Sequence, residues 1–535
     1  MTTVSGEIVD GWIVEQSTAT QGIDELRFVI ESGGTQASVL AAAGTVISAR
    51  MSVEPLFETA SELSNFLLLR IPDVKRPDRA DLFEVAAALR EATNAVSVEP
   101  DTGSDFFQPE TPPPTPGTAE SAGWTFWCWA EQMPSDLDWA IKTLRVPEAW
   151  EYSRGLGRPT KGRGVVIFQP DTGVMPAHVA MPVGIADDPR AANFLEAGKP
   201  PIDPALAGMN PAHGTGTCSV IACPGPVPMQ GAAPEATLVP IRCVESVAVF
   251  DQSQVAKAVD HARRQGAHVI TMSLGGIPSR ALHAAVQKAV AENVIVVSAA
   301  GNCVAQVVWP ARYPEVICVG GINENLKMWQ GSCRGPSVAL SGPAEFVLRA
   351  DGKDPATPPR RVSGGQGTSF ATALTAAVCA LWQAHHGRDA LVAMLPTGRK
   401  LQGLFRDMAR RSVSIPPDFN HDKLGAGVLD ALALLKLDPS QALAPENGQE
   451  AAAESPDQSL RSLLEAAFGE EGPEAAALDL SDVQHHAELA SVAFDRIRAR
   501  QTLRGQIESL PPPSMSPSLR QAVGFPLGHS SGSAP

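Results

Sequence analysis

The chain has 535 residues, of which 44% are hydrophobic and 19% charged, so it can bury sizeable cores and is not disordered or fibrous as a whole. Its formal net charge of -16 argues against a nucleic-acid or anionic-membrane binder, which would need a basic face. No run of about 18 apolar residues occurs, so we expect no membrane-spanning segment.

The cellular compartment is predicted from the start of the chain and from the cysteines. Residues 1–16 lack a basic segment followed by an apolar one, which is the pattern of a secretory signal. The eight cysteines are scattered, with neither a CxxC pair nor a zinc-like spacing, and several lie in apolar runs that favour reduced, buried thiols. These features predict the cytoplasm, with secretion as the alternative.

Residues 1–105 are predicted to form a small α+β domain. A strand is expected at 65–71, a helix with regularly spaced apolar positions at 78–93, and a second strand at 95–99. The segment 106–123 is rich in proline and has little apolar surface to bury, so we expect a linker there.

Residues 124–437 show a different pattern, in which short apolar runs alternate with amphipathic helical stretches. Strands that are apolar throughout and alternate with helices are typical of a parallel sheet that is covered on both faces. We therefore predict an α/β domain with a mostly parallel sheet and helices on both sides. The predicted strands lie at 164–169, 237–244, 268–274, 294–300 and 316–321.

Residues 438–535 are rich in Ala, Glu, Gln and Pro and carry a net negative charge. Residues 478–510 could form one amphipathic helix, and the segment 511–535 is expected to be disordered. We therefore predict a largely disordered or helical tail whose acidic residues are solvated rather than bound to a specific ligand.

Three motifs in the α/β region carry side chains suited to acyl transfer. Asp171 ends a predicted strand, His213 begins an apolar helix, and Ser369 begins a longer one. In an open α/β sheet the ligand crevice lies beyond the carboxyl ends of the strands, so these three residues can converge there. Asn302 follows another strand and offers a side-chain donor, and the backbone N–H of Ser369 is a second one.

These residue types match the needs of nucleophilic catalysis on a carbonyl group. A serine hydroxyl needs a base within hydrogen-bonding reach, and imidazole has a suitable pKa. The imidazole needs a buried carboxylate that fixes its tautomer, and the developing oxyanion needs hydrogen-bond donors. The sequence therefore predicts catalytic Asp171, His213 and Ser369, with Asn302 in the oxyanion site.

The motifs resemble those of the subtilisin-like serine protease (subtilase) family, in the order Asp171-Thr-Gly, His213-Gly-Thr, Asn302 and Gly-Thr-Ser369-x-Ala. The resemblance covers about residues 135–437. It implies that Ser273, Leu274 and Gly275 pair with the backbone of a peptide substrate. It also implies that no metal ion or organic cofactor is required.

The N-terminal domain resembles the propeptide of this family. This resemblance implies that the domain covers the substrate-binding face as an intramolecular inhibitor and is released by a cut between about Glu99 and Gln108.

Several positions depart from the family pattern. Ala180 stands where a calcium-binding Asp is common, and residues 223–230 lack the usual ligands, so we expect no calcium there. Gln169-Pro170 precedes the catalytic Asp, and because proline cannot donate to a ladder, the strand is expected to end there. Cys303 is expected to be a simple packing cysteine.

The sequence thus predicts a serine endopeptidase that acts on a protein or peptide substrate, with no nucleic-acid or membrane partner. An intracellular processing or regulatory role is favoured, because an unrestrained protease is hazardous in cytosol. Two alternatives stay open, a catalytically silent peptide-binding scaffold and a secreted degradative protease.

Overall fold

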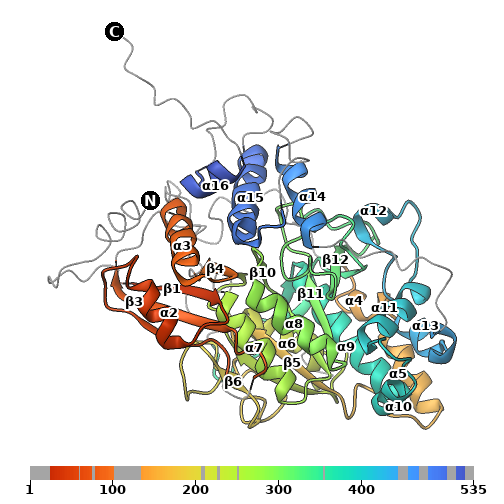
Figure 1. The fold of residues 1–535 in the computed structure, drawn as a ribbon. Coiled ribbons are helices and arrows are strands. Elements are labelled where there is room, and N and C mark those ends of the chain that lie inside the picture. The colour runs from red at the N-terminus through yellow and green to blue at the C-terminus, as the bar shows by residue number, and fades with distance from the viewer. Residues whose placement is uncertain are drawn as a thin grey trace. The chain divides into compact units, whose positions relative to one another are not determined.

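The computed structural model describes residues 24–58, 61–74, 79–101, 134–205, 211–225, 229–249, 252–352, 356–443, 456–468, 480–502 and 514–523. The predicted linker at 106–123 lies outside the described residues. Contacts divide the chain into two compact units (Figure 1). Unit 1 comprises residues 1–106, 277–281 and 457–535, and unit 2 comprises residues 107–276 and 282–456.

Unit 1 contains a four-stranded antiparallel sheet in the order β2-β3-β1-β4. Its strands are β1 (Asp24–Glu31), β2 (Ser52–Pro55), β3 (Phe66–Val74) and β4 (Ser97–Pro100). The helices α2 (Gln36–Ala43) and α3 (Arg79–Thr93) pack on one face, where alternate residues of β1 and β3 form a continuous apolar core. The predicted strand–helix–strand pattern corresponds to β3, α3 and β4, whereas β1, β2 and α2 were not predicted.

The C-terminal helices also belong to unit 1. They are α14 (Pro456–Phe468), the short 3-10 helix η3 (Val483–His485), α15 (His486–Thr502) and α16 (Pro517–Ala522). The prediction of disorder for 511–535 is wrong for the described residues 514–523, because α16 forms there and Leu519 is fully buried. A segment predicted as a solvated tail therefore shares a compact unit with the N-terminal sheet.

Unit 2 is built on a seven-stranded parallel sheet in the order β13-β12-β11-β9-β5-β7-β6. Both faces of this sheet are buried, as the α/β prediction requires: Ile295 and Val297 share one core with α9, and Val296 between them points the other way and is equally buried. The strands are β5 (Val166–Asp171), β6 (Ala192–Asn193), β7 (Thr237–Arg242), β9 (Val269–Met272), β11 (Ile295–Ala299), β12 (Ile317–Ile322) and β13 (Leu340–Pro343).

The helix α9 (Thr368–His386) runs through the main core of unit 2. It begins after Gly367 and ends at Gly387, whose φ of 80° is a conformation that suits glycine. Two of its buried polar residues are satisfied within the helix, since the hydroxyls of Thr372 and Thr375 donate to carbonyls one turn earlier at 2.8 Å. These two hydroxyls are therefore buried in the core without being left unpaired.

The other elements of unit 2 are short strands and further helices, most of which are labelled in Figure 1. No described helix is long and apolar enough to cross a membrane. The remaining elements are α4 (Trp139–Thr143), α5 (Val146–Gly155), α6 (His213–Ala222), β8 (Ala248–Val249), α7 (Gln252–Arg264), β10 (Gly275–Gly276), α8 (Arg280–Ala291) from Leu282 on, β14 (Val347–Ala350), β15 (Val362–Gly365), α10 (Arg388–Ala393), α11 (Leu401–Ser412), α12 (His421–Leu424), α13 (Ala431–Lys436) and η2 (Pro439–Ala442).

The strand β5 continues through Pro170, contrary to the expectation that it ends there. Pro170 pairs with Ile241 of β7, and β5 stays in register with β7 as far as Asp171. Backbone groups of a parallel strand alternate between its two neighbours, and the carbonyl of Asp171 faces β7. Pro170 therefore faces β9, whose pairing with β5 stops at Phe168, so the missing N–H costs no ladder bond.

Candidate active site

Asp171 lies at the carboxyl end of β5, with only 1% of its side chain exposed. Its carboxylate accepts a hydrogen bond from the backbone N–H of Thr172 at 2.7 Å. Both carboxylate oxygens lie close to Nδ1 of His213, at 2.9 and 3.0 Å. Because a carboxylate accepts, this contact favours the tautomer in which Nδ1 carries the proton and Nε2 is an acceptor.

His213 is held at the first position of α6 by close backbone packing behind it. A Cβ on Gly214 would lie 2.2 Å from the carbonyl oxygen of Gly173, so no larger residue fits at that position. The N–H of Gly214 donates to the hydroxyl of Thr172 at 3.0 Å, and that hydroxyl donates to Asp203 at 2.5 Å. The helix start is thus fixed against the loop that carries the predicted catalytic carboxylate.

Gln169 joins the strand of Asp171 to the helix of His213 and was not predicted as part of the site. Its side-chain amide donates to the carbonyl of Gly214 at 3.0 Å and to the hydroxyl of Thr217 at 2.8 Å. Its carbonyl oxygen accepts from the thiol of Cys218 at 3.1 Å. Burial raises the pKa of that thiol well above its ordinary value, so Cys218 keeps the proton that it donates.

Ser369 is the second residue of α9 and is 4% exposed. Its hydroxyl donates to the carbonyl oxygen of Ser273 at 3.3 Å, and the hydroxyl of Ser273 donates back to the carbonyl of Ser369 at 2.9 Å. Within the described part of the chain no hydrogen bond joins Ser369 to His213. The structure therefore brings Asp171 and His213 into direct contact, with Ser369 bonded to the predicted substrate strand.

Asn302 is oriented by the residue that precedes Ser369. Its side-chain oxygen accepts from both the N–H and the hydroxyl of Thr368, each at 2.9 Å. This arrangement fixes the amide so that Nδ2 remains as a donor. A Cβ on Gly367, where φ is 150°, would lie 3.4 Å from Asn302 Nδ2 and 3.7 Å from both the amide nitrogen and the hydroxyl oxygen of Ser369. Two donors and the serine oxygen thus surround one point that only glycine leaves open.

The predicted substrate strand Ser273-Leu274-Gly275 is partly occupied by the chain itself. The N–H of Gly275 donates to Val247 at 2.9 Å, and Gly275 pairs in parallel with β8. Ser273 and Ser369 are joined by the two hydrogen bonds described above. Among the described residues, only Leu274 of these three forms no backbone hydrogen bond, and this position can pair with a peptide.

The cysteines differ in part from the sequence prediction. Six of them are free and buried: Cys218, Cys223, Cys243, Cys318, Cys333 and Cys379. Cys303, directly after Asn302, is disulfide-bonded, so the prediction of a simple packing cysteine is wrong at this position. The single-sequence pattern gave no sign of this bond, because no paired spacing marks it.

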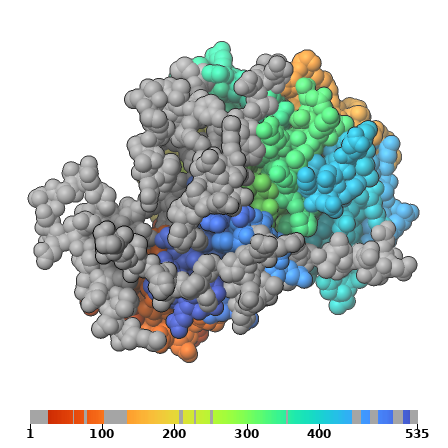
Figure 2. Space-filling view, turned by 90° about the horizontal axis from the view of Figure 1, so that it is seen from above, coloured from red at the N-terminus to blue at the C-terminus, as the bar shows by residue number. Residues whose placement is uncertain are grey.

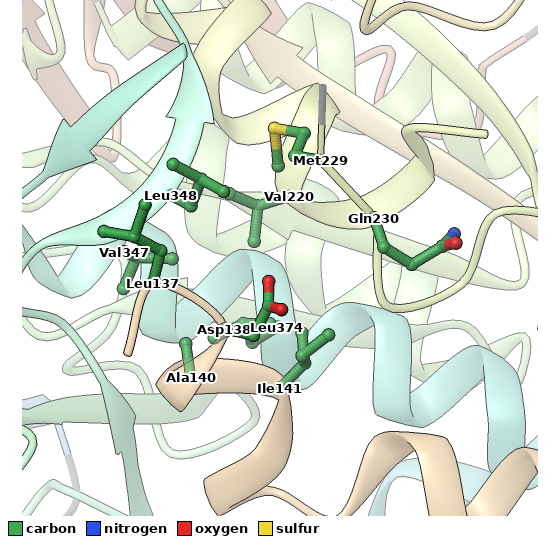
Figure 3. A pocket seen from close by; sticks show the side chains of 10 residues that line it. All are labelled: Leu137, Asp138, Ala140, Ile141, Val220, Met229, Gln230, Val347, Leu348 and Leu374. Atoms are coloured by element: carbon green, nitrogen blue, oxygen red, sulfur yellow. The ribbon is translucent and has the colours of Figure 1, made fainter. Parts of the chain in front are cut away.

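The described residues contain no cluster of metal ligands and one small pocket away from the candidate site. No group of three or more His, Cys, Asp or Glu side chains there could hold a metal ion, and Ala180 is fully buried. A small pocket of about 20 Å³, enough for a single water molecule, lies between α4, α6, α9 and β14 (Figure 3). None of the residues discussed above lines it, and it is formed by Leu137, Asp138, Ala140, Ile141, Val220, Met229, Gln230, Val347, Leu348 and Leu374.

Comparison with known proteins gives the class of the chain, a serine endopeptidase of the subtilisin type. The sequence model of the Subtilase family matches residues 162–423, and this region of the chain belongs to that family. A protease of this class acts on a protein or peptide substrate.

The chain is similar to named relatives and to a solved structure over part of its length. An intracellular serine protease of Paenibacillus polymyxa is 29% identical over 261 residues, which cover 47% of this chain and 74% of that protein. Subtilisin E of Bacillus subtilis is 31% identical over 183 residues, 33% of this chain and 46% of that protein. The crystal structure of MycP1 from Mycobacterium smegmatis is 23% identical, with a TM-score of 0.44, and covers 60% of this chain and 92% of that chain.

Proposed function

We propose that the chain hydrolyses peptide bonds with Ser369 as nucleophile, His213 as general base and acid, and Asp171 as the group that orients His213. The observation that carries this proposal is the buried Asp171 carboxylate, whose two oxygens lie 2.9 and 3.0 Å from His213 Nδ1. In the neutral imidazole, that contact favours the tautomer whose Nε2 can accept a proton, which is the tautomer a general base needs.

In the proposed reaction, the Ser369 hydroxyl oxygen attacks the carbonyl carbon of the scissile peptide bond while its proton passes to His213 Nε2. Asn302 Nδ2 and the N–H of Ser369 stabilise the resulting oxyanion. The C–N bond then breaks as His213 returns the proton to the leaving amine. Water attacks the acyl-enzyme by the same route and regenerates the serine.

Active-site labelling tests this proposal most directly. A fluorophosphonate should label the protein at Ser369, and Ser369→Ala should abolish both labelling and peptidase activity. Ser414→Ala is the matched control, because Ser414 is an exposed serine in the same unit. Near wild-type turnover in Ser369→Ala would make the assignment of the nucleophile wrong.

One observation favours a second candidate, the catalytically silent peptide-binding scaffold. The Ser369 hydroxyl donates to Ser273 rather than to His213, so catalysis requires that this side chain turn toward the imidazole. A protein that binds peptides but neither reacts with a fluorophosphonate nor cleaves them would support the scaffold. Labelling at Ser369 would exclude it.

We further propose a narrow processing or regulatory role, since the chain carries additional segments on both sides of the family region. Mass spectrometry of cleaved proteins, with Ser369→Ala as the control, would identify the substrate. The cytoplasm stays the prediction from the sequence, but the disulfide at Cys303 favours the secreted alternative because disulfides persist in oxidising compartments. Alkylation of thiols in intact cells would decide between the two compartments.

We also propose that the N-terminal domain acts as an intramolecular inhibitor that is cut by Ser369. Asp101, the last residue of this domain that the structure describes, is buried, pairs with Arg27 at 3.2 Å and continues the backbone pairing of β4. We therefore narrow the expected cut to residues 102–108. Protein that lacks residues 1–105 should cleave a peptide substrate faster than the full chain, without an initial delay. An unchanged folding yield together with an unchanged rate of peptide cleavage would contradict the inhibitor role.

A further inference from the structure

The edge of the N-terminal sheet at β4, which has no neighbouring strand on its outer side among the described residues, is covered by a residue from the other end of the chain. Among the strands that the structure describes, β4 lies at the edge of the sheet and pairs with β1 alone. The side-chain amide of Gln484 accepts from the N–H of Val98 at 2.9 Å and donates to its carbonyl at 2.8 Å. Gln484 is 4% exposed, and its amide completes the edge as the backbone of a neighbouring strand would do.

Two arginines on α3 bind acidic and polar residues of the same C-terminal segment. Arg79 pairs with Asp495 and donates to the hydroxyl of Ser491 at 2.8 Å. Three turns later, Arg90 pairs with Asp482 at 2.9 Å. These side chains are partly exposed, so each pair contributes little to stability by itself, but together they fix which face of α3 is covered.

A buried hydrogen-bond chain extends this contact to α16. Glu488 of α15 is 2% exposed and accepts from the N–H and the hydroxyl of Ser516, at 2.6 and 2.8 Å. The N–H of Ser518 donates to Glu84 of α3 at 2.8 Å. The contact therefore joins α3, α15 and α16 through buried or half-buried polar groups that all have partners.

Apolar burial shows that this contact is extensive. In α15, residues on every side of the helix are buried, including Ala490, Ala493 and Phe494, and such a helix needs partners on more than one face. Phe83 of α3 is 6% exposed although it is not part of the core between α3 and the sheet. Both views show the blue C-terminal helices against the orange α3 (Figures 1 and 2).

We propose that the described residues 480–502 and 514–523, which we name the C-terminal clasp, retain the N-terminal domain (residues 24–101) after the linker at 106–123 has been cut. The clasp and the domain lie at opposite ends of the chain, with the whole of unit 2 between them in sequence. A cut in the linker leaves the domain joined to the rest of the molecule through the clasp. Release of the domain alone then requires that these non-covalent contacts break.

This inference rests on the proposed function only for the question of which protease makes the first cut. The clasp itself follows from the contacts within unit 1. A tethered partner acts at high effective concentration. After a cut in the linker, the clasp therefore keeps the N-terminal domain at a high effective concentration near unit 2, even where its intrinsic affinity for unit 2 is modest. While the clasp contacts hold, the domain therefore loses its covalent link to unit 2 only after two cuts, one in the linker and one in residues 444–455.

The test uses the full chain with Ser369→Ala, so that its outcome does not depend on the proposed protease activity. Recognition sites for an unrelated, specific protease are inserted after Gly117 and, in a second version, also after Gly448, and an affinity tag is added to the N-terminus. After one cut, the tag should recover the whole chain. After two cuts, the tagged fragment should still recover the fragment that begins after Gly448.

Variants of the clasp provide the second measurement. Gln484→Glu keeps the shape of the side chain but, in its ionised form at pH 8, cannot donate to Val98, and at that pH should weaken retention in the doubly cut protein by roughly 10–100-fold. Arg163→Ala, which removes an exposed ion pair with Glu235 in unit 2, is the matched control and should leave retention unchanged. A tagged fragment that elutes without the C-terminal fragment after two cuts would overturn the proposal, as would equal retention in Gln484→Glu and wild type.

Discussion

Glu488 makes the C-terminal clasp sensitive to pH. Burial raises its pKa from the ordinary 4.5 to about 7; the hydrogen bonds from Ser516 and the charge of Arg79 oppose this rise, and the charge of Glu84 adds to it. The folded state therefore holds a proton that the unfolded state has lost between pH 4.5 and 7. The contribution of Glu488 to stability is therefore fully present below pH 4.5 and is lost as the pH rises toward 7, by up to about 3 kcal/mol.

The variant Glu488→Gln should remove this dependence. Its carbonyl oxygen can accept from the N–H of Ser516, and its amide can donate to the hydroxyl, which already accepts from the N–H of Leu519 at 3.1 Å. At pH 8 the variant should protect the amides of 480–502 from hydrogen exchange by up to roughly 10²-fold more than wild type. Burial also raises the pKa of Glu99 to about 7, so part of the dependence of stability on pH remains in both the variant and the wild type.

Hydrogen exchange followed by mass spectrometry in a Ser369→Ala background measures this effect, after correction for the intrinsic pH dependence of exchange. Peptides from unit 2 serve as the internal reference. Wild-type protection in residues 480–502 that stays constant or rises between about pH 5 and 8 would refute the reasoning.

Three further predictions concern the proposed active site. Gln169→Ala should destabilise the protein by about 1–3 kcal/mol, because it removes the buried partner of Thr217 and Gly214, and should lower kcat more than it raises KM; thermal unfolding and steady-state kinetics measure both effects. Asn302→Ala should lower kcat by roughly 10²–10³-fold, and a large rise in KM at constant kcat would instead make Asn302 a binding residue. EDTA should change the melting temperature little, since Ala180 replaces a calcium ligand; a large fall that calcium reverses would contradict this expectation.

The sequence predicted the sheet of unit 2 well because its strands are buried on both faces. Runs such as 294–300 are apolar throughout, and this local signal alone distinguishes them from loops. The strands β6 and β13 were missed because they are short, and the run LSGP at Leu340–Pro343 contains Gly and Pro. Propensity could not reveal them, since they are held in place by pairing with β7 and β12.

The candidate site was predictable where position along an element determines it. Asp171 follows an apolar strand, and His213 and Ser369 begin apolar helices, so topology alone brings them toward one edge of the sheet. Gln169 was not predictable in its role, because a glutamine before a proline matches no motif and its partners lie more than forty residues away in the chain. The bond of the Ser369 hydroxyl to Ser273 depends on a side-chain rotamer, which no sequence pattern specifies.

The C-terminal segment shows most clearly what a local pattern leaves open. Its amphipathic character indicated a helix, and its acidic charge favoured solvation. Neither feature identifies the residues elsewhere in the chain that this segment contacts. Asp482 and Asp495 are satisfied by Arg90 and Arg79, which lie about four hundred residues earlier in the chain. Opposite charges at the two ends of a chain form ion pairs only when the fold brings those ends together. An acidic segment after a folded domain is therefore better tested against the exposed arginines and open sheet edges of the other domains than classified by its composition.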